Sequence, residues 1–221
     1  MKILYLILAR KGSKRLKNKN LLKINKKTLI ELTINFVKKV APIKNIIFST
    51  DSKKMLNIAN KLGINTPWLR PKKFSLDKST SFDASLHAIK WFESKFFKID
   101  AIALFQPTSP FRSKDHFIKA LKKFKNNPKV PLVSIKKIGL SSNKIFKKKK
   151  NFLINYSKSK KGIDVFMPTG SFYLIKKTTL IKNKDFYTDK MNYFQIDDRL
   201  MNIDIDTSDD YLMAKKIFSS K

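Results

Sequence analysis

The sequence predicts an α/β fold, in which helices cover both faces of an open, mostly parallel sheet. Three observations support this prediction. Short apolar runs typical of buried strands alternate with segments whose apolar residues recur at helical spacing. Polar residues that can cap helices stand at the start of several of those segments. With 42% hydrophobic residues and 18 Phe among 221 residues, the chain can build one large core, so a single domain over residues 1–221 is expected.

The first third of the chain alternates strand and helix. Residues 2–8 form the first apolar run, and residues 28–40 have apolar side chains at helical spacing. A second apolar run covers residues 45–50, and Asp51 or Ser52 can cap the helix that follows. The order strand, helix, strand, helix is typical of parallel strands joined by helical crossovers.

The middle of the chain continues this alternation. Residues 80–83 have the pattern of a capping box, and the helix that they begin is expected to bury Phe96. Residues 101–105 predict a central strand, which leads into a segment held rigid by two prolines, and Ser113 can cap the next helix. Further strands are expected at residues 131–135, 170–175, 192–196 and 202–205, before a last helix capped by Thr207.

A segment at about residues 136–168 interrupts the pattern, and we interpret it as an excursion from the domain. Its apolar residues have no regular period, and residues 147–150 are four lysines in a row. Such a segment is usually solvated. It nevertheless carries apolar side chains with no obvious place in the core, namely Ile145, Phe146, Phe152, Leu153 and Ile154. Apolar surface of this size predicts a partner, and we expect a homodimer.

The net charge of +33 comes from 49 basic and 16 acidic residues. Nucleic-acid binding is one interpretation. We favour a solvated coat of lysines, because they are spread along the whole chain without a nucleic-acid-binding motif, and we expect no specific nucleic-acid partner. The chain has no run of eighteen apolar residues and no cysteine. We therefore expect no membrane span and no disulfide, and the cytoplasm is the simplest location.

Arginine occurs at only five positions, 10, 15, 70, 112 and 199, in a chain that otherwise uses lysine. The guanidinium group binds phosphate and carboxylate through two parallel hydrogen bonds, a geometry that lysine cannot copy. The few arginines are therefore candidates for binding sites.

The first predicted strand leads into a basic loop, residues 8–20, which is a candidate anion site. Gly12 lets the backbone come close to a ligand, and neighbouring N–H groups can point at its oxygens. Arg10 and Lys14 add full positive charge, and a polyphosphate is the anion expected to need it. The loop has neither the Walker A pattern nor the dinucleotide-binding pattern of glycines. The alternative interpretation is a basic surface turn.

Other unusual residues follow the next predicted strands. Ligands bind at the carboxyl ends of the strands in open α/β sheets, so the basic loop, Asp51 and residues 106–112 are expected on one rim. At that rim Gln106 could recognise a base or a sugar through its amide. A rigid turn is the alternative for this segment. The only histidines, His87 and His116, fall in predicted helices and are expected to be structural.

Six of the sixteen acidic residues fall within residues 197–210. Asp204 and Asp206 flank Ile205 with the spacing of a strand, so both side chains are expected to face the same way. Two carboxylates on one face are a natural seat for Mg²⁺, which takes phosphate oxygens and water as its other ligands. Helix capping is the alternative, and it explains Asp209 and Asp210 but not Asp204 and Asp206.

Several of these residues belong to short motifs whose order and spacing are specific, although each motif is weak alone. The motifs are Leu8-Ala9-Arg10-x-Gly12-Ser13-Lys14 with Lys19-Asn20, Ser49-Thr50-Asp51, Arg70-Pro71, Asp77-x-Ser79-Thr80-Ser81, Gln106-Pro107-Thr108-Ser109-Pro110, Gly170-Ser171-Phe172-Tyr173 and Ile203-Asp204-Ile205-Asp206. Over nearly its full length the chain resembles the CMP-N-acylneuraminate cytidylyltransferases, also called CMP-sialic acid synthetases. The resemblance implies a Rossmann-like nucleotidyltransferase fold, an excursion used for dimerisation, and Mg²⁺-dependent transfer of CMP from CTP to a nine-carbon sugar acid.

The resemblance also implies roles for individual residues. Triphosphate ligands are implied at Arg10, Lys14 and Lys19, and cytidine contacts at Asn20, Arg70, Ser79 and Ser81. The nucleotide-binding loop is completed by Ala9, Gly12 and Ser13. Sugar contacts are implied at Gln106, Thr169 and Gly170, and metal ligands at Asp204 and Asp206. The residues expected to carry catalysis are Arg10, Lys14 and Asp206.

The basic loop departs from the family pattern, because Arg15 and Lys17 stand where glycine and proline are common. An arginine at position 15 is similar to the pattern of the pseudaminic acid branch of the family, whereas the sequence of residues 106–112 is closer to the sialic and legionaminic acid branches. The identity of the sugar therefore stays open. Two other functions remain as alternatives: a CMP-Kdo-type or other sugar nucleotidyltransferase, and a basic RNA-associated protein that is not an enzyme.

Overall fold

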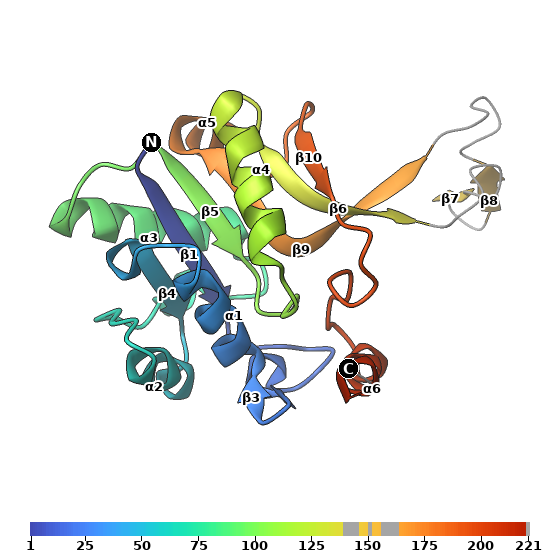
Figure 1. Cartoon of the computed structure of the whole chain (residues 1–221), viewed down its shortest axis with the longest axis horizontal. Helices are drawn as coiled ribbons and strands as arrows, with labels where there is room; N and C mark the ends of the chain where they lie inside the picture. The colour runs from blue at the N-terminus through green and yellow to red at the C-terminus, as the bar shows by residue number, and fades with distance from the viewer. Residues whose placement is uncertain (139–145, 150–151, 156–163, 220–221) are drawn as a thin grey trace.

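The structure, a computed structural model, describes residues 1–138, 146–149, 152–155 and 164–219. Its centre is a six-stranded sheet in the order β10-β6-β9-β5-β1-β4 (Figure 1). The strands of this sheet are β1 (Ile3–Ala9), β4 (Ile46–Thr50), β5 (Ala101–Phe105), β6 (Leu132–Ile138), β9 (Val165–Lys176) and β10 (Asn192–Gln195). Two short pairs lie outside it: β2 (Lys23–Ile24) with β3 (Lys27–Thr28), and β7 (Phe146–Lys149) with β8 (Phe152–Asn155).

Most of the sheet is parallel, which confirms the predicted fold class. β1 pairs in parallel with β4 and with β5, and β10 pairs in parallel with β6. β9 is the exception, since it runs antiparallel between β5 and β6. The carboxyl ends of β1, β4 and β5 consequently meet at one edge, where the loops after Ala9, Thr50 and Phe105 begin.

Helices cover both faces of the sheet (Figure 1). They are α1 (Leu29–Lys38), α2 (Lys53–Lys61), α3 (Ser81–Lys95), α4 (Lys114–Asn126), α5 (Lys177–Asn183) and α6 (Ser208–Ser219). Thr28, Ser52, Thr80 and Ser113 each accept a hydrogen bond from a backbone N–H group in the first turn of α1, α2, α3 and α4. The helix starts predicted at Ser52, at residues 80–83 and at Ser113 are therefore confirmed. Within the described residues, no helix is long and apolar enough to span a membrane.

The core consists of apolar layers on the two faces of the sheet. On one face Tyr5 and Ile7 of β1 pack with residues of α1, α2 and α4. On the other face Leu4 and Leu6 pack with residues of α3 and α5. A smaller cluster around Ile205 joins α6 to the β2–β3 hairpin. Because β1 is buried on both faces, it is a rigid support for the basic loop that follows it.

The excursion lies at the tip of a long antiparallel pair. β6 extends to Ile138, β9 begins at Val165, and these two residues are paired. The excursion is therefore shorter at both ends than residues 136–168. β7 and β8 pair with each other beyond this tip (Figure 1). The apolar residues that predict a dimer, Ile145 and the side chains of Phe146, Phe152, Leu153 and Ile154, lie outside the described part of the structure.

Two expectations of local structure are wrong, and one helix was not predicted. Residues 202–205 are not a strand; Ile205 instead donates its N–H to the carbonyl of Thr108 (2.8 Å). Phe96 is not buried, because α3 ends one residue before it and leaves the residue 57% exposed. α5 was not predicted, since only Leu180 of its seven residues is buried and the segment shows no apolar period.

Candidate active site

A cavity of about 610 Å³ opens at the carboxyl ends of β1 and β5. Its wall comes from four parts of the chain: the basic loop, the segment from Arg70 into α3, the residues after β5, and the aspartates before α6. Eleven of the predicted site residues line it, namely Arg10, Ser13, Lys14, Lys19, Asn20, Arg70, Ser79, Ser81, Gln106, Asp204 and Asp206. Four predicted site residues do not: Ala9, Gly12, Thr169 and Gly170.

Two side chains, one from outside the basic loop and one from its last residue, hold its backbone in place. The carboxylate of Asp51 accepts a hydrogen bond from the N–H of Lys11 (2.7 Å). The amide of Asn20, which is buried, donates to the carbonyl of Arg10 (3.1 Å). Open space surrounds Gly12 on its side-chain side, since a Cβ there would have no atom within 4 Å. The loop is therefore a supported turn whose basic side chains reach the cavity.

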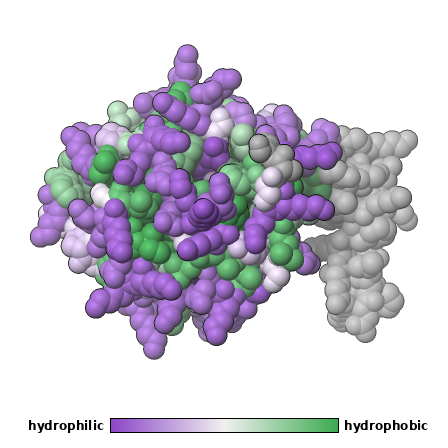
Figure 2. Space-filling model, turned by 60° about the horizontal axis from the view of Figure 1, so that its bottom comes forward, coloured by the Kyte–Doolittle hydropathy of each residue, from purple (hydrophilic) through white to green (hydrophobic). Residues whose placement is uncertain are grey.

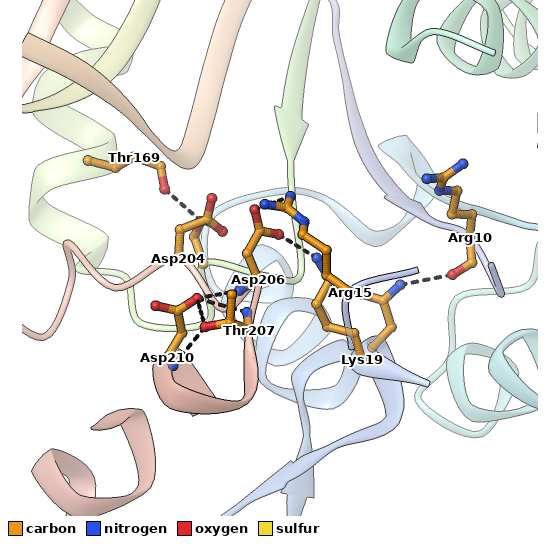
Figure 3. A network of polar contacts seen from close by, with 10 residues as sticks. Arg10, Arg15, Lys19, Thr169, Asp204, Asp206, Thr207 and Asp210 are labelled. Atoms are coloured by element: carbon orange, nitrogen blue, oxygen red, sulfur yellow. Dashed lines mark hydrogen bonds and ion pairs between the residues drawn. The ribbon is translucent and has the colours of Figure 1, made fainter. Parts of the chain in front are cut away.

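The four cationic side chains of the loop that line the cavity are bound to two carboxylates. Asp77 accepts from Arg10 (3.0 Å) and from Lys14 (2.7 Å). Asp206 accepts from Arg15 (2.5 Å) and from Lys19 (2.6 Å), and lies between these side chains and Asp204 (Figure 3). The hydrogen bond from Lys14, together with the one from Arg10, holds the pKa of Asp77 below its ordinary value.

Asp204 and Asp206 both border the cavity although their segment is not a strand. The isoleucines between and before them, Ile203 and Ile205, are buried in the cluster beneath α6, so the aspartates turn the other way. Burial raises the pKa of Asp204; a hydrogen bond with Thr108 opposes that rise, and the nearby charge of Asp206 adds to it. A partly buried carboxylate next to a second one is an environment that a bound cation would stabilise.

These two carboxylates fit a magnesium ion only as part of its ligand set. Among the described residues, no group of three or more His, Cys, Asp or Glu side chains is arranged to hold a metal. Mg²⁺ is commonly bound through one or two carboxylates together with phosphate oxygens and water, so two aspartates suffice when a nucleotide supplies the rest. The donor chemistry at Asp204 and Asp206 therefore matches a nucleotide-bound Mg²⁺ rather than a protein-only metal centre.

Arg70 lies under the opposite part of the cavity wall and joins three segments. It is 5% exposed, and its Nε donates to Ser75 Oγ (3.0 Å). Its Nη2 donates to the carbonyl of Ala9 (3.4 Å), which explains why Ala9 supports the site without lining it. Its own N–H donates to the carbonyl of Thr50 (2.7 Å). Burial lowers the pKa of Arg70, and the nearby charge of Asp51 opposes this shift.

Gln106 lines the cavity at the end of β5, with its amide oxygen turned toward the protein. That oxygen accepts from the hydroxyl of Tyr173 (3.4 Å), which also contacts the hydroxyl of Tyr187 (3.1 Å). Gly170 has φ +74°, and a Cβ there would come within 2.5 Å of Ser109 Oγ and 2.9 Å of Gln106 Oε1. Glycine is thus required at this position on both conformational and steric grounds.

Thr169 does not meet the cavity as predicted. Its side chain is fully buried, and its hydroxyl donates to Ser134 Oγ (2.8 Å). Its carbonyl accepts from Ser109 Oγ (2.6 Å), and Thr169 does not line the cavity. The side chain therefore stabilises the contact between β6 and β9, and sequence spacing could not show its direction.

Arg112 and the two histidines are structural. Arg112 donates to the carbonyls of Gln106 (2.6 Å) and Ser171 (2.7 Å) and so ties the end of β5 to β9. His87 packs edge-on against Trp68, with 4.6 Å between ring centroids, and His116 packs against an aromatic ring of β10. Neither histidine lines the cavity.

Two residues of the site, Asp77 and Arg15, had no predicted role. Asp77 stands in one of the sequence motifs, but only the folded chain brings it to Arg10 and Lys14. Arg15 was visible as one of five arginines, and its partner Asp206 lies 191 residues away. The scarcity of arginine did mark Arg15 as a candidate, and the scarcity of acidic residues is the signal that could have marked Asp77.

The fold is the Rossmann-like fold of nucleotidyltransferases. A solved structure of CMP:2-keto-3-deoxy-manno-octonic acid synthetase, complexed with CTP, matches with a TM-score of 0.73 and 14% sequence identity. The match covers 100% of this chain and 99% of that one. At such low identity the likeness establishes the fold and nothing finer.

Sequence comparison then gives the family. Residues 4–219 match the cytidylyltransferase family, and the chain belongs to it. N-acylneuraminate cytidylyltransferase of Escherichia coli O18:K1:H7 is 31% identical over 227 residues, which cover 100% of this chain and 53% of that protein. CMP-N,N'-diacetyllegionaminic acid synthase of Legionella pneumophila is 30% identical, with 98% and 96% covered. The chain therefore spans about half the length of the first relative and nearly all of the second.

Proposed function

We propose that the chain transfers CMP from CTP to the anomeric hydroxyl of a nonulosonic acid, a nine-carbon sugar acid, and releases pyrophosphate. The observation that carries this proposal is the cavity at the carboxyl end of β1, which is lined both by four cations of one loop and by two carboxylates before α6. Concentrated positive charge beside paired carboxylates suits a polyphosphate with its metal ion. The names of the two relatives support a CMP-linked sugar acid as the product class.

The proposed reaction needs no covalent intermediate with the protein. The anomeric oxygen forms a bond to the α-phosphorus of CTP, and the bond from that phosphorus to the oxygen shared with the β-phosphate breaks. The hydroxyl proton passes to a base. The cationic side chains of Arg10, Lys14, Arg15 and Lys19 hold the triphosphate and neutralise the charge that grows on the leaving pyrophosphate. Positioning and charge neutralisation are thus the contribution of the chain.

The remaining lining residues divide between the two substrates. We assign the cytidine to the wall formed by Asn20, Arg70, Ser79 and Ser81, beside the start of α3. We assign the sugar acid to Gln106, whose amide oxygen already accepts a hydrogen bond from Tyr173. Its NH₂ group is then left to donate to an acceptor on the sugar acid, such as the carboxylate. Thr169 does not contact the sugar acid in this assignment. Gly170 contributes only indirectly, because its lack of a side chain leaves space for Gln106.

Mg²⁺ is part of the proposal, held by Asp204 and Asp206. When bound there with the nucleotide, the ion would act as a Lewis acid that stabilises charge on the phosphates. The support is the donor set itself, two carboxylates on one side of a segment whose isoleucines are buried on the other. Asp206 must then exchange part of its ion pairing with Arg15 and Lys19, both of which can turn to phosphate oxygens.

A homodimer is also part of the proposal. Apolar side chains near the base of the excursion are exposed: Phe166 by 39%, Met167 by 42% and Tyr193 by 52%. The rings of Phe166 and Tyr193 stack at 6.4 Å, so they form one patch. Sedimentation should show a dimer at micromolar concentration, and a monomer under these conditions would contradict the proposal. A cytoplasmic location stays a prediction, which cell fractionation would test.

The decisive experiment measures pyrophosphate release. Four nucleoside triphosphates should be crossed with sialic, legionaminic, pseudaminic and Kdo acids. The proposal expects release with CTP and at least one nine-carbon acid. Release with CTP and only the Kdo acid would support the second candidate, a CMP-Kdo-type synthetase.

The RNA-associated alternative makes a different prediction. Figure 2 shows hydrophilic residues spread around one face, with hydrophobic areas between them, and not gathered into one stripe. A diffuse coat of lysine should bind RNA weakly, and binding should vanish as salt rises, because it depends on counterion release. Tight, sequence-selective binding at physiological salt, without pyrophosphate release for any substrate pair, would replace the proposed function.

A further inference from the structure

The carboxylate of Asp77 bridges two cations of the basic loop. One oxygen lies 3.0 Å from Arg10 Nη1, and the other lies 2.7 Å from Lys14 Nζ. All three side chains line the cavity. A phosphate group offers the same arrangement of oxygens to the same two side chains. The carboxylate of Asp77 and a phosphate group of a ligand therefore compete for Arg10 and Lys14.

The chain around Asp77 is built as a turn that presents this carboxylate. The N–H of Ser79 donates to the carbonyl of Leu76 (3.0 Å), and the N–H of Leu76 donates to Ser79 Oγ (3.1 Å). The hydroxyl of Ser79 in turn donates to the carbonyl of Lys73 (2.9 Å). Arg10 also approaches the carbonyl of Leu76 (3.4 Å). Asp77 itself is half exposed, so it can turn into solvent without opening the core.

We propose that Asp77 is a built-in competitor of the polyphosphate, an internal anion that limits affinity at Arg10 and Lys14. This inference rests on the proposed function, in which these two side chains hold phosphate. The chain has a net charge of +33 and attracts every anion in its surroundings. Asp77 offsets that attraction at the site itself. It keeps inorganic phosphate from occupying the pair and helps pyrophosphate to leave after transfer.

Asp77 is suited to this role because it stays ionised. Its ion pairs hold its pKa below the ordinary carboxyl value, so it carries a full negative charge at neutral pH. Its pairs are also exposed, and exposed ion pairs are weak and easily exchanged. A triphosphate or pyrophosphate, which carries several charges, can therefore displace Asp77 where a single weakly held anion cannot.

The test compares Asp77→Asn with the parent protein by isothermal titration calorimetry. The substitution removes the charge and keeps the size of the side chain. Pyrophosphate and CTP should each bind roughly three- to tenfold more tightly to the variant, as the loss of two exposed competing pairs implies. Inorganic phosphate should become a measurable inhibitor, while the KM for the sugar acid stays unchanged. Asp189→Asn, the same charge change at an exposed residue outside the cavity, should bind both ligands as the parent does.

Two further variants keep the result interpretable. Asp77→Ala should change affinity in the same direction as Asp77→Asn, and Asp77→Glu, which keeps the charge, should stay near the parent. Unchanged or weaker pyrophosphate binding by Asp77→Asn and Asp77→Ala, with thermal unfolding like the parent's, would overturn the inference alone. A parent that binds neither CTP nor pyrophosphate would remove the proposed function, and this inference with it.

Discussion

The two carboxylates that hold the basic loop are mounted in different ways. Asp77 stands on an exposed turn, its side chain is 51% exposed, and its neighbour Leu76 is 50% exposed. Asp206 is 31% exposed, and its neighbour Ile205 is completely buried under α6. Each carboxylate nevertheless pairs with two cations at similar distances. The same ion-pair chemistry thus serves once where the anion can move and once where packing fixes it.

Removing the fixed carboxylate should have the largest effect. Asp206→Ala should lower kcat roughly a hundred- to thousandfold, because the proposed Mg²⁺ loses a ligand and several kcal/mol of Lewis-acid stabilisation are lost. Pyrophosphate release at saturating CTP measures this effect. Asp209→Ala is the matched control, since it removes an aspartate from the first turn of α6 outside the cavity. Near-parental turnover of Asp206→Ala, or a parent that stays active in EDTA, would show that the metal assignment is wrong.

The next largest effect is on the free energy of unfolding, when the apolar residue next to each carboxylate is truncated. Ile205→Ala should lower the free energy of unfolding by roughly 2–5 kcal/mol, because it leaves a cavity among the buried side chains next to Asp206. Leu76→Ala, the equivalent change next to Asp77, should alter it by less than about 0.5 kcal/mol. Urea unfolding followed by circular dichroism measures both. Equal losses for the two variants would remove the distinction between a fixed and a movable carboxylate.

Replacing Arg10, which pairs with the movable Asp77, should have an intermediate effect on the binding of CTP. Arg10→Lys keeps the charge but loses the fork that can bind a phosphate through two hydrogen bonds. The KM for CTP should rise about tenfold, the equivalent of one charge-assisted hydrogen bond. Arg199→Lys makes the same change at an exposed position outside the cavity and should leave the KM as it is. An Arg10→Lys protein with parental turnover and CTP affinity would mean that the loop is only a basic turn.

The smallest expected effect is on thermal stability, and it concerns Asp204, the carboxylate beside Asp206. Burial raises the pKa of Asp204, so the folded protein holds the carboxyl proton of Asp204 more tightly than the unfolded chain does. Stability contributed by this group is therefore present at low pH and is lost as the pH rises through the raised pKa. Asp204→Asn should melt at a slightly higher temperature than the parent at neutral pH in EDTA, and the difference should disappear in acid. A variant that melts at a lower temperature than the parent at neutral pH would contradict this account.

Much of the fold was predictable because its parallel strands are continuous apolar runs. β4 and β5 are buried along their whole length and β1 at every residue but Leu8, and caps such as Ser52 mark where a helix begins. The direction of β9 was not predictable, since an apolar run has the same pattern in a parallel and an antiparallel neighbour. α5 escaped prediction because a short helix with one buried residue has no apolar period.

The candidate site shows the same division. The alternation around Ile205 was enough to place Asp204 and Asp206 on one side, although the segment forms no strand. The direction of Thr169 was not predictable, because Gly170 with its φ of +74° interrupts the alternation of side chains at that point. The bridge formed by Asp77 also depends on long-range folding, since its partners Arg10 and Lys14 lie more than sixty residues earlier.

The start of β9 separates a part of the chain where insertions or deletions are tolerated, the excursion, from a part where they are not, the strand itself. The strand runs from Val165, at the base of the excursion, to Lys176; its register against β6 shifts near Gly170, which lies against Gln106. Side chains alternate along a strand, so inserting or deleting one residue between Val165 and Gly170 would exchange the two faces of that stretch. Changes beyond the Ile138–Val165 pair leave this register untouched. A change of length in the excursion therefore leaves the position of Gly170 unchanged, whereas a change of length between Val165 and Gly170 does not.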